Sequence, residues 1–279
     1  FESNILSLNA IIGKADIDLV NKFRNIDVIG IDINAAVNFA TANQARVLNG
    51  SYGPNAPTKK IWDGNGNLVP NPEYVQLNIQ SYYNSVSFPE YSALKRAADS
   101  GMLLVFAAGN DREDQEKIAV NPTGAALYPY IRPGNAGSGV YQFLDDNGTP
   151  VDQTKTDFSG LSGSIVSVVA TDKNNRIASF SNLCGVTAAW CIAAPGVGIY
   201  STVPIGIYLY KDGTSISAPH VSGPASVLIQ ALLFLTVLQI ALTMSSTPSF
   251  LGPCPFNHPT TPFDSVPLNP RHTPVSTVL

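Results

Sequence analysis

The chain has 279 residues, of which 44% are hydrophobic and 13% are charged, and its formal net charge is −4. This length and apolar content suffice for one large globular domain or two ordinary ones. Because no Lys- or Arg-rich run is present, the charge pattern does not predict a nucleic-acid partner. No signal-peptide pattern follows Phe1, so we expect the chain to begin inside a longer sequence.

Apolar strand-like runs alternate with helix-like stretches from residue 5 to residue 110. Strands are predicted at Ile5–Leu8, Ala45–Leu48 and Leu103–Ala108, and helices around Ile31–Ala45 and over Pro89–Asp99. Strands that alternate with helices form parallel sheets that are covered on both faces. The first part of the chain therefore predicts an α/β fold.

Two stretches, residues 54–88 and 111–160, are rich in Pro, Gly, Asn and Asp. They are expected to be long surface loops with about one short element each. Beyond them, Ser164–Ala170 is predicted to be a strand, and Ile177–Ser181 and Gly198–Ser201 are predicted to be further strands of the same core.

The composition changes after residue 212, because the last 67 residues contain only two charged side chains. The apolar stretch Ala225–Met244 could suggest a membrane span, but Gln230 and Gln239 interrupt it and no charged flank anchors it, so a span is not favoured. Eight prolines follow between residues 248 and 274. Residues 231–279 are therefore expected to be an apolar and then Pro-rich tail without evident packed structure.

Two of the three cysteines, Cys184 and Cys191, lie seven residues apart in a loop-like stretch. A local disulfide is favoured over two buried free thiols. Metal binding is the least favoured alternative, because the stretch has neither a Cys-x-x-Cys pair nor a nearby histidine. A disulfide would favour an exported protein.

The most informative stretch is Gly213-Thr-Ser-Ile-Ser-Ala-Pro-His-Val-Ser-Gly223. Gly213 permits a tight turn, and Ser215 falls where a helix begins, which presents its hydroxyl. A lone Gly-x-Ser would indicate only a helix cap. The whole string resembles the nucleophile motif of the subtilisin-like (subtilase) serine peptidases and differs from it only at Ile216 and Ser217. The resemblance implies that Ser215 is a nucleophile in a three-layer fold, with a mostly parallel sheet between helices.

Two more stretches resemble this family in order and spacing. Ala107-Ala-Gly-Asn110 resembles the oxyanion-hole motif, which implies that the side-chain amide of Asn110 donates to the negative oxygen of the tetrahedral intermediate. Asn49-Gly-Ser-Tyr-Gly53 resembles the segment whose backbone pairs with an extended substrate. Ordinary strand-ending turns are the alternative for both stretches. The residues assigned to substrate binding are Ser51, Tyr52, Gly53, Ala108 and Gly109.

Phe180–Gly185 and Ala193–Thr202 also look like subtilase core segments, and the loop from Cys184 to Cys191 is similar to one in the secreted autotransporter subtilases of Gram-negative bacteria. The resemblance implies a peptide or protein substrate and a secreted or cell-surface location. It implies membrane association only through a C-terminal translocator. Calcium is common in the family, but no set of calcium ligands stands out in the sequence, so no cofactor and no metal ligand are assigned.

The family's catalytic residues occur in the order Asp, His, Ser, so both partners should precede Ser215. Residues 1–214 contain no histidine. His220 lies five positions along the same helix, about 140° around it, and is interpreted as a structural residue. Asp32 ends an apolar run but lacks the Thr/Ser-Gly that follows the family's catalytic Asp, so it is interpreted as a helix-start residue.

The sequence therefore predicts a partial, N-terminally truncated subtilisin-like domain over residues 1–230 that is inactive by itself, followed by the tail 231–279. A non-catalytic peptide-binding relative and a decayed gene product are the alternatives. Pro224 favours decay, because proline inside a helix costs about 3 kcal/mol. The order Ser215, Asp264, His272 matches α/β-hydrolases, but their Gly-x-Ser-x-Gly motif is absent here.

Overall fold

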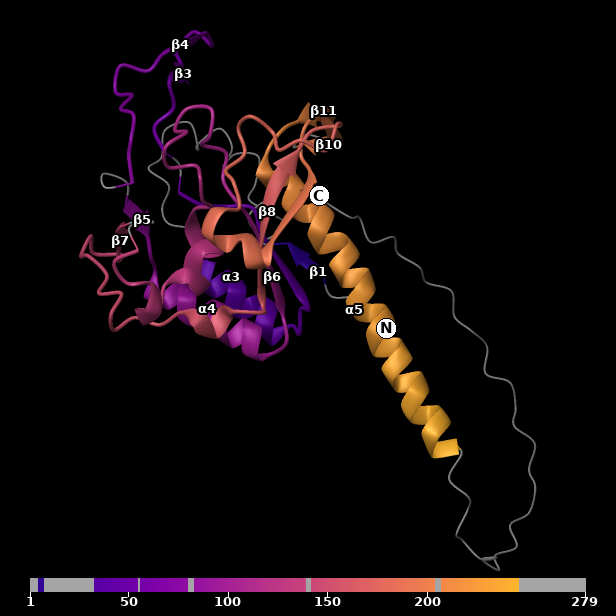
Figure 1. Ribbon diagram of the computed structural model, residues 1–279. Coiled ribbons are helices and arrows are strands. Elements are labelled where there is room, and N and C mark those ends of the chain that lie inside the picture. Colours follow the sequence, from indigo (N-terminus) through magenta and orange to yellow (C-terminus); the bar gives the residue numbers. More distant parts are fainter. Residues whose placement is uncertain are drawn as a thin grey trace, which may run out of the picture.

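The centre of the molecule is a parallel sheet covered by helices (Figure 1). The computed structural model describes residues 5–7, 33–54, 56–79, 83–138, 142–203 and 207–245. Within these residues the sheet has five strands in the order β1-β2-β6-β8-β9, and each neighbouring pair is parallel. The strands are Ile5–Ser7 (β1), Val47–Gly50 (β2), Leu103–Ala107 (β6), Ile165–Thr171 (β8) and Cys191–Pro195 (β9).

Helices lie on both faces of this sheet: α3 (Ile33–Ala42) and α4 (Phe88–Asp99) on one, and α5 (Thr214–Ser245) on the other. Consecutive side chains of a strand point to opposite faces. Leu104 of β6 accordingly packs with α3 and α4, whereas its neighbour Val105 packs with α5. The expected three-layer arrangement is confirmed.

The remaining short elements lie outside the central sheet. Three two-stranded pairs are formed by Lys60–Trp62 (β3) with Leu68–Pro70 (β4), Tyr83–Ser85 (β5) with Gln142–Leu144 (β7), and Ile199–Val203 (β10) with Ile207–Lys211 (β11). Four 3₁₀ helices among the described residues are Gly124–Tyr130 (η1), Pro133–Asn135 (η2), Ser159–Leu161 (η3) and Gly185–Trp190 (η4).

Several expectations about strands were wrong. Ile177–Ser181 is not a strand of the core, because only Ile177 forms a bridge, to Thr171. The strand expected at Gly198–Ser201 is part of β10, which pairs with β11 outside the central sheet. Conversely, β9 belongs to the core and was not predicted. Its Ile192 is 46% exposed, so the strand lacks the continuous buried run that marks β8.

The two stretches expected to be long loops contain more elements than anticipated. The first holds β3, β4 and β5, and the second holds η1, η2, β7 and η3. The β3–β4 hairpin is mostly exposed, so its residues carry no alternation of buried and exposed positions. Turn residues are therefore its main sequence signal.

Helix α5 contains both Pro219 and Pro224 and continues to Ser245, so the expected domain boundary at residue 230 lies inside a helix. In the part of the chain that the structure describes, no helix is long and apolar enough to cross a membrane. Asp32, Asp264 and His272, about which the sequence made predictions, lie outside the described residues.

Candidate active site

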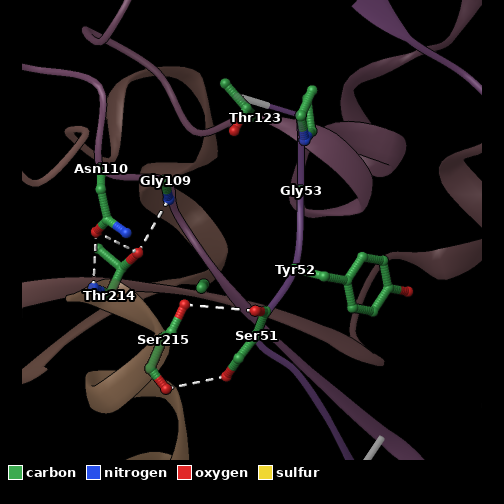
Figure 2. A pocket seen from close by; sticks show the side chains of 10 residues that line it. Ser51, Tyr52, Gly53, Gly109, Asn110, Thr123, Thr214 and Ser215 are labelled. Atoms are coloured by element: carbon green, nitrogen blue, oxygen red, sulfur yellow. Dashed lines mark hydrogen bonds between the residues drawn. The ribbon is translucent and has the colours of Figure 1, made fainter. Parts of the chain in front are cut away.

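A cavity of about 290 Å³ lies where the segments after β2 and β6 meet the first turn of α5 (Figure 2). Parallel strands end at the same edge of a sheet, so the residues that follow them come together there. The cavity is lined by Ser51, Tyr52, Gly53, Pro54, Ala107, Gly109, Asn110, Thr123, Thr214 and Ser215. Tertiary structure thus gathers the residues predicted for the site, with the exception of Ala108.

Ala108, which the sequence also assigned to substrate binding, is not among the residues that line the cavity. Its side chain is fully buried. Its backbone N–H donates to the Val168 carbonyl (2.9 Å), and its own carbonyl accepts from the Thr123 N–H (3.0 Å). Both of its backbone groups are therefore used inside the protein, and its neighbour Ala107 lines the cavity instead.

The half-buried Ser215 is bound to Ser51 by two hydrogen bonds. The Ser215 hydroxyl donates to the Ser51 carbonyl (3.4 Å), and the Ser51 hydroxyl donates to the Ser215 carbonyl (3.0 Å). In an uninterrupted helix the Ser215 carbonyl would accept from the N–H of residue 219, but that residue is Pro219 and has no N–H. The proline thus leaves a carbonyl for Ser51 to bind.

No base contacts Ser215 within the described residues. His220 is exposed, and its Nδ1 lies 2.8 Å from the Ile216 carbonyl oxygen on its own helix. The Ser215 hydroxyl donates to the backbone carbonyl of Ser51, which cannot take up a proton at neutral pH. The described residues therefore place a serine hydroxyl at the cavity without an activating partner among themselves.

The side chain of Asn110 is held through its carbonyl oxygen. Oδ1 accepts from the Thr214 N–H (2.8 Å) and the Thr214 hydroxyl (3.0 Å), and that hydroxyl accepts from the Gly109 N–H (3.2 Å). Nδ2 has no hydrogen-bond acceptor among the described residues. The N–H of Ser215, at the start of α5, is likewise unpaired there, as is common in the first turn of a helix. The cavity therefore has two donors available for an oxyanion.

Gly109 adopts a φ of +110°, a conformation that L side chains rarely adopt. A Cβ at this position would lie 2.7 Å from Nδ2 of Asn182 and 2.9 Å from Oγ1 of Thr123. Asn182 is fully buried; its Oδ1 accepts from the Asp111 N–H (2.9 Å), and its Nδ2 donates to the Asp111 carboxylate (3.2 Å). Burial raises the pKa of Asp111. Asn182 thus anchors the turn that carries Asn110.

The aromatic ring of Tyr52 points away from Ser215 (Figure 2). Its hydroxyl donates to Oε1 of Glu90 in α4 (2.9 Å), and the Tyr128 hydroxyl donates to Oε2 (2.5 Å). Burial is the main cause of the raised pKa of Glu90, although both hydrogen bonds oppose it. The buried carboxyl group ties the segment after β2 to α4 and η1.

Cys184 and Cys191 form a disulfide, with their Cα atoms 5.8 Å apart. The bond encloses η4, whose Trp190 donates from Nε1 to the Ala126 carbonyl in η1 (3.1 Å). Because η1 follows Thr123 directly, this hydrogen bond links the disulfide loop to the segment that lines one end of the cavity.

Comparison with known proteins identifies the family. The model of the Subtilase family matches residues 7–258. The chain belongs to the subtilase family. Its α/β architecture, with a parallel sheet between helices, is the subtilisin-like fold that the sequence predicted. Within the described residues of this subtilase, no group of three His, Cys, Asp or Glu side chains is arranged to hold a metal ion.

Curated subtilase relatives include large bacterial proteins. Serotype-specific antigen 1 of Mannheimia haemolytica is 30% identical over 241 residues, which is 84% of this chain and 21% of that protein. The extracellular serine protease of Serratia marcescens is 27% identical over 273 residues (81% and 23%). The Neisserial autotransporter lipoprotein NalP of Neisseria meningitidis is 29% identical over 184 residues (64% and 14%). The predicted resemblance to autotransporter subtilases is confirmed, and this chain spans under a quarter of each relative.

Proposed function

We propose that this chain carries the nucleophile and the oxyanion-binding groups of a serine endopeptidase site. In the complete reaction, a histidine from outside these residues would take the hydroxyl proton of Ser215 while Oγ bonds to the carbonyl carbon of a peptide, and the electron pair of the C=O bond would move to the oxygen. The amide of Asn110 and the N–H of Ser215 are the donors for that oxygen. The hydrogen bonds of Thr214 to Oδ1, which leave Nδ2 of Asn110 free beside Ser215, support this proposal most directly.

The substrate would bind as an extended strand along the segment after β2. Among the described residues, no group pairs with the backbone N–H or carbonyl of Tyr52 or Gly53. Such free backbone groups at the end of a buried strand can add a peptide by main-chain hydrogen bonds. The tie between Tyr52 and Glu90 keeps this segment in place while its backbone faces the cavity.

We also propose that the 279 residues do not hydrolyse peptides by themselves. A serine hydroxyl is a weak nucleophile until a base takes its proton, and no histidine precedes Ser215 in this sequence. In subtilisin, loss of the triad histidine lowers kcat by about 10⁶-fold. Activity would require a histidine and an aspartate from outside these residues.

The free backbone groups of Tyr52 and Gly53 favour a second candidate function, which is the binding of extended peptides without cleavage. Both functions place the peptide in the same site and differ only in the chemical step. The names of two relatives, an extracellular protease and an autotransporter lipoprotein, support an extracellular or cell-surface location, and the disulfide accords with it.

Labelling with a fluorophosphonate probe separates the two functions. We expect Ser215 in this chain to react no faster than a surface serine, with S215A as the matched control, while fluorescein-labelled oxidised insulin B chain binds both proteins in a fluorescence anisotropy titration. Stoichiometric modification of Ser215 would show that the chain is active and contradict the proposed inactivity. If the labelled polypeptide binds neither protein, the proposed peptide site is wrong.

A further inference from the structure

Thr123 occupies the end of the cavity opposite Ser215 (Figure 2). The residue is only 4% exposed, and its backbone N–H is fixed by the Ala108 carbonyl at 3.0 Å. Its hydroxyl lines the cavity and has no hydrogen-bond partner among the described residues. A buried hydroxyl is normally paired, so this group is available to a molecule that enters the cavity.

Two glycines form the walls on either side of this hydroxyl. A Cβ atom placed on Gly53 would lie 3.7 Å from Oγ1 of Thr123, and one placed on Gly109 would lie 2.9 Å from it. Neither Gly53 nor Gly109 has a side chain, so the space between them, next to the Thr123 hydroxyl, suits a flat group. The cavity of about 290 Å³ has no charged side chain in its lining.

From this arrangement we propose that Thr123 determines specificity: it selects an uncharged substrate side chain with a flat, hydrogen-bonding end, namely tyrosine or glutamine. This inference rests on the proposed peptide site. A phenol or a carboxamide fits between the two glycine walls and pairs with the Thr123 hydroxyl. Phenylalanine or methionine would fill a similar space, but each would displace the water that pairs with the Thr123 hydroxyl and offer no hydrogen bond in its place. Lysine or glutamate would lose hydration with no opposite charge to compensate it.

A series of synthetic peptides tests this selection on the full chain without any reaction at Ser215. The peptides share one sequence of glycine and alanine and carry Tyr, Phe, Gln, Met or Lys at the central position, so this side chain is the one that can fill the cavity. In isothermal titration we expect Tyr to bind about 5- to 10-fold more tightly than Phe, and Gln more tightly than Met by a similar factor, with Lys the weakest.

The variant T123V keeps the shape of the side chain and removes only the hydroxyl. We expect it to bring both ratios to about one by weakening the Tyr and Gln peptides, while T123S keeps the hydroxyl and restores the ratios. Equal binding of the matched pairs by the unaltered chain overturns the selection by Thr123, as do ratios that T123V leaves unchanged. In either case the peptide site itself stands. If none of the five peptides binds the unaltered chain, the proposed peptide site is wrong and this inference falls with it.

Discussion

Replacement of Gly109 by alanine tests how the turn beside the nucleophile is held. Gly109 needs a φ of +110°, and a Cβ there would lie 2.7 Å from Nδ2 of the fully buried Asn182. Asn182 cannot move without loosening its two hydrogen bonds to Asp111. Gly163 provides the matched control, because its φ is +82° and nothing lies within 4 Å of the corresponding Cβ position.

The magnitude follows from two contributions. A side chain at positive φ costs about 1–2 kcal/mol, and both variants bear this cost. Displacement of Asn182 adds the loss of its two hydrogen bonds to Asp111, each about 1 kcal/mol with more for the one to the carboxylate, and the weakening of a longer third one to the Asn121 carbonyl (3.3 Å). We therefore expect G109A to lower the free energy of unfolding by about 3–5 kcal/mol, and G163A by about 1–2 kcal/mol.

Urea unfolding followed by far-ultraviolet circular dichroism measures both free energies in the full chain. The difference between G109A and G163A isolates the contacts of the added methyl group, because the backbone strain is common to both. If the two variants lose equal stability, Asn182 gives way without cost, and it does not anchor the turn that carries Asn110.

Two further perturbations concern the surroundings of the cavity. The raised pKa of Glu90 means that the folded chain keeps a proton that the unfolded chain has already lost, so from pH 4.5 upward this group makes the folded state less stable as pH rises. Urea unfolding at a series of pH values should show that the free energy of unfolding falls more steeply with pH in the unaltered chain than in E90Q. If the two proteins give parallel curves of free energy against pH, this expectation is contradicted. Replacement of Cys184 and Cys191 by serine should lower the free energy of unfolding by about 2–3 kcal/mol, and with it the melting temperature. The loss is small for a disulfide because the bond closes a loop of only seven residues' separation. An unchanged melting temperature in calorimetry would show that the bridge adds no stability.

Short contiguous strings were enough to predict the proposed site residues from sequence alone. Ser215 was identified within an eleven-residue string, and Asn110 within a four-residue one, because a helix start and a strand-ending turn are local structures. The buried strands β6 and β8 were predictable for the same reason, since continuous apolar runs indicate burial on both faces. The half-exposed β9 is also apolar, but it was missed because alanine and proline, which form three of its five residues, are rare in strands.

Tertiary structure alone decided how these residues cooperate. Thr214 fixes Asn110 from a position 104 residues further along the chain, and no local pattern predicts which atom of the amide remains free. Thr123 has no motif around it, and its place in the cavity arises only because β2 and β6 are neighbours, which brings Gly53 and Gly109 to its two sides. The sequence by itself predicted the residues that we propose as nucleophile and donor, because each lies in a local structure, a helix start or a strand-ending turn. The shape of the cavity depended on contacts between distant segments, which only the folded sheet defines.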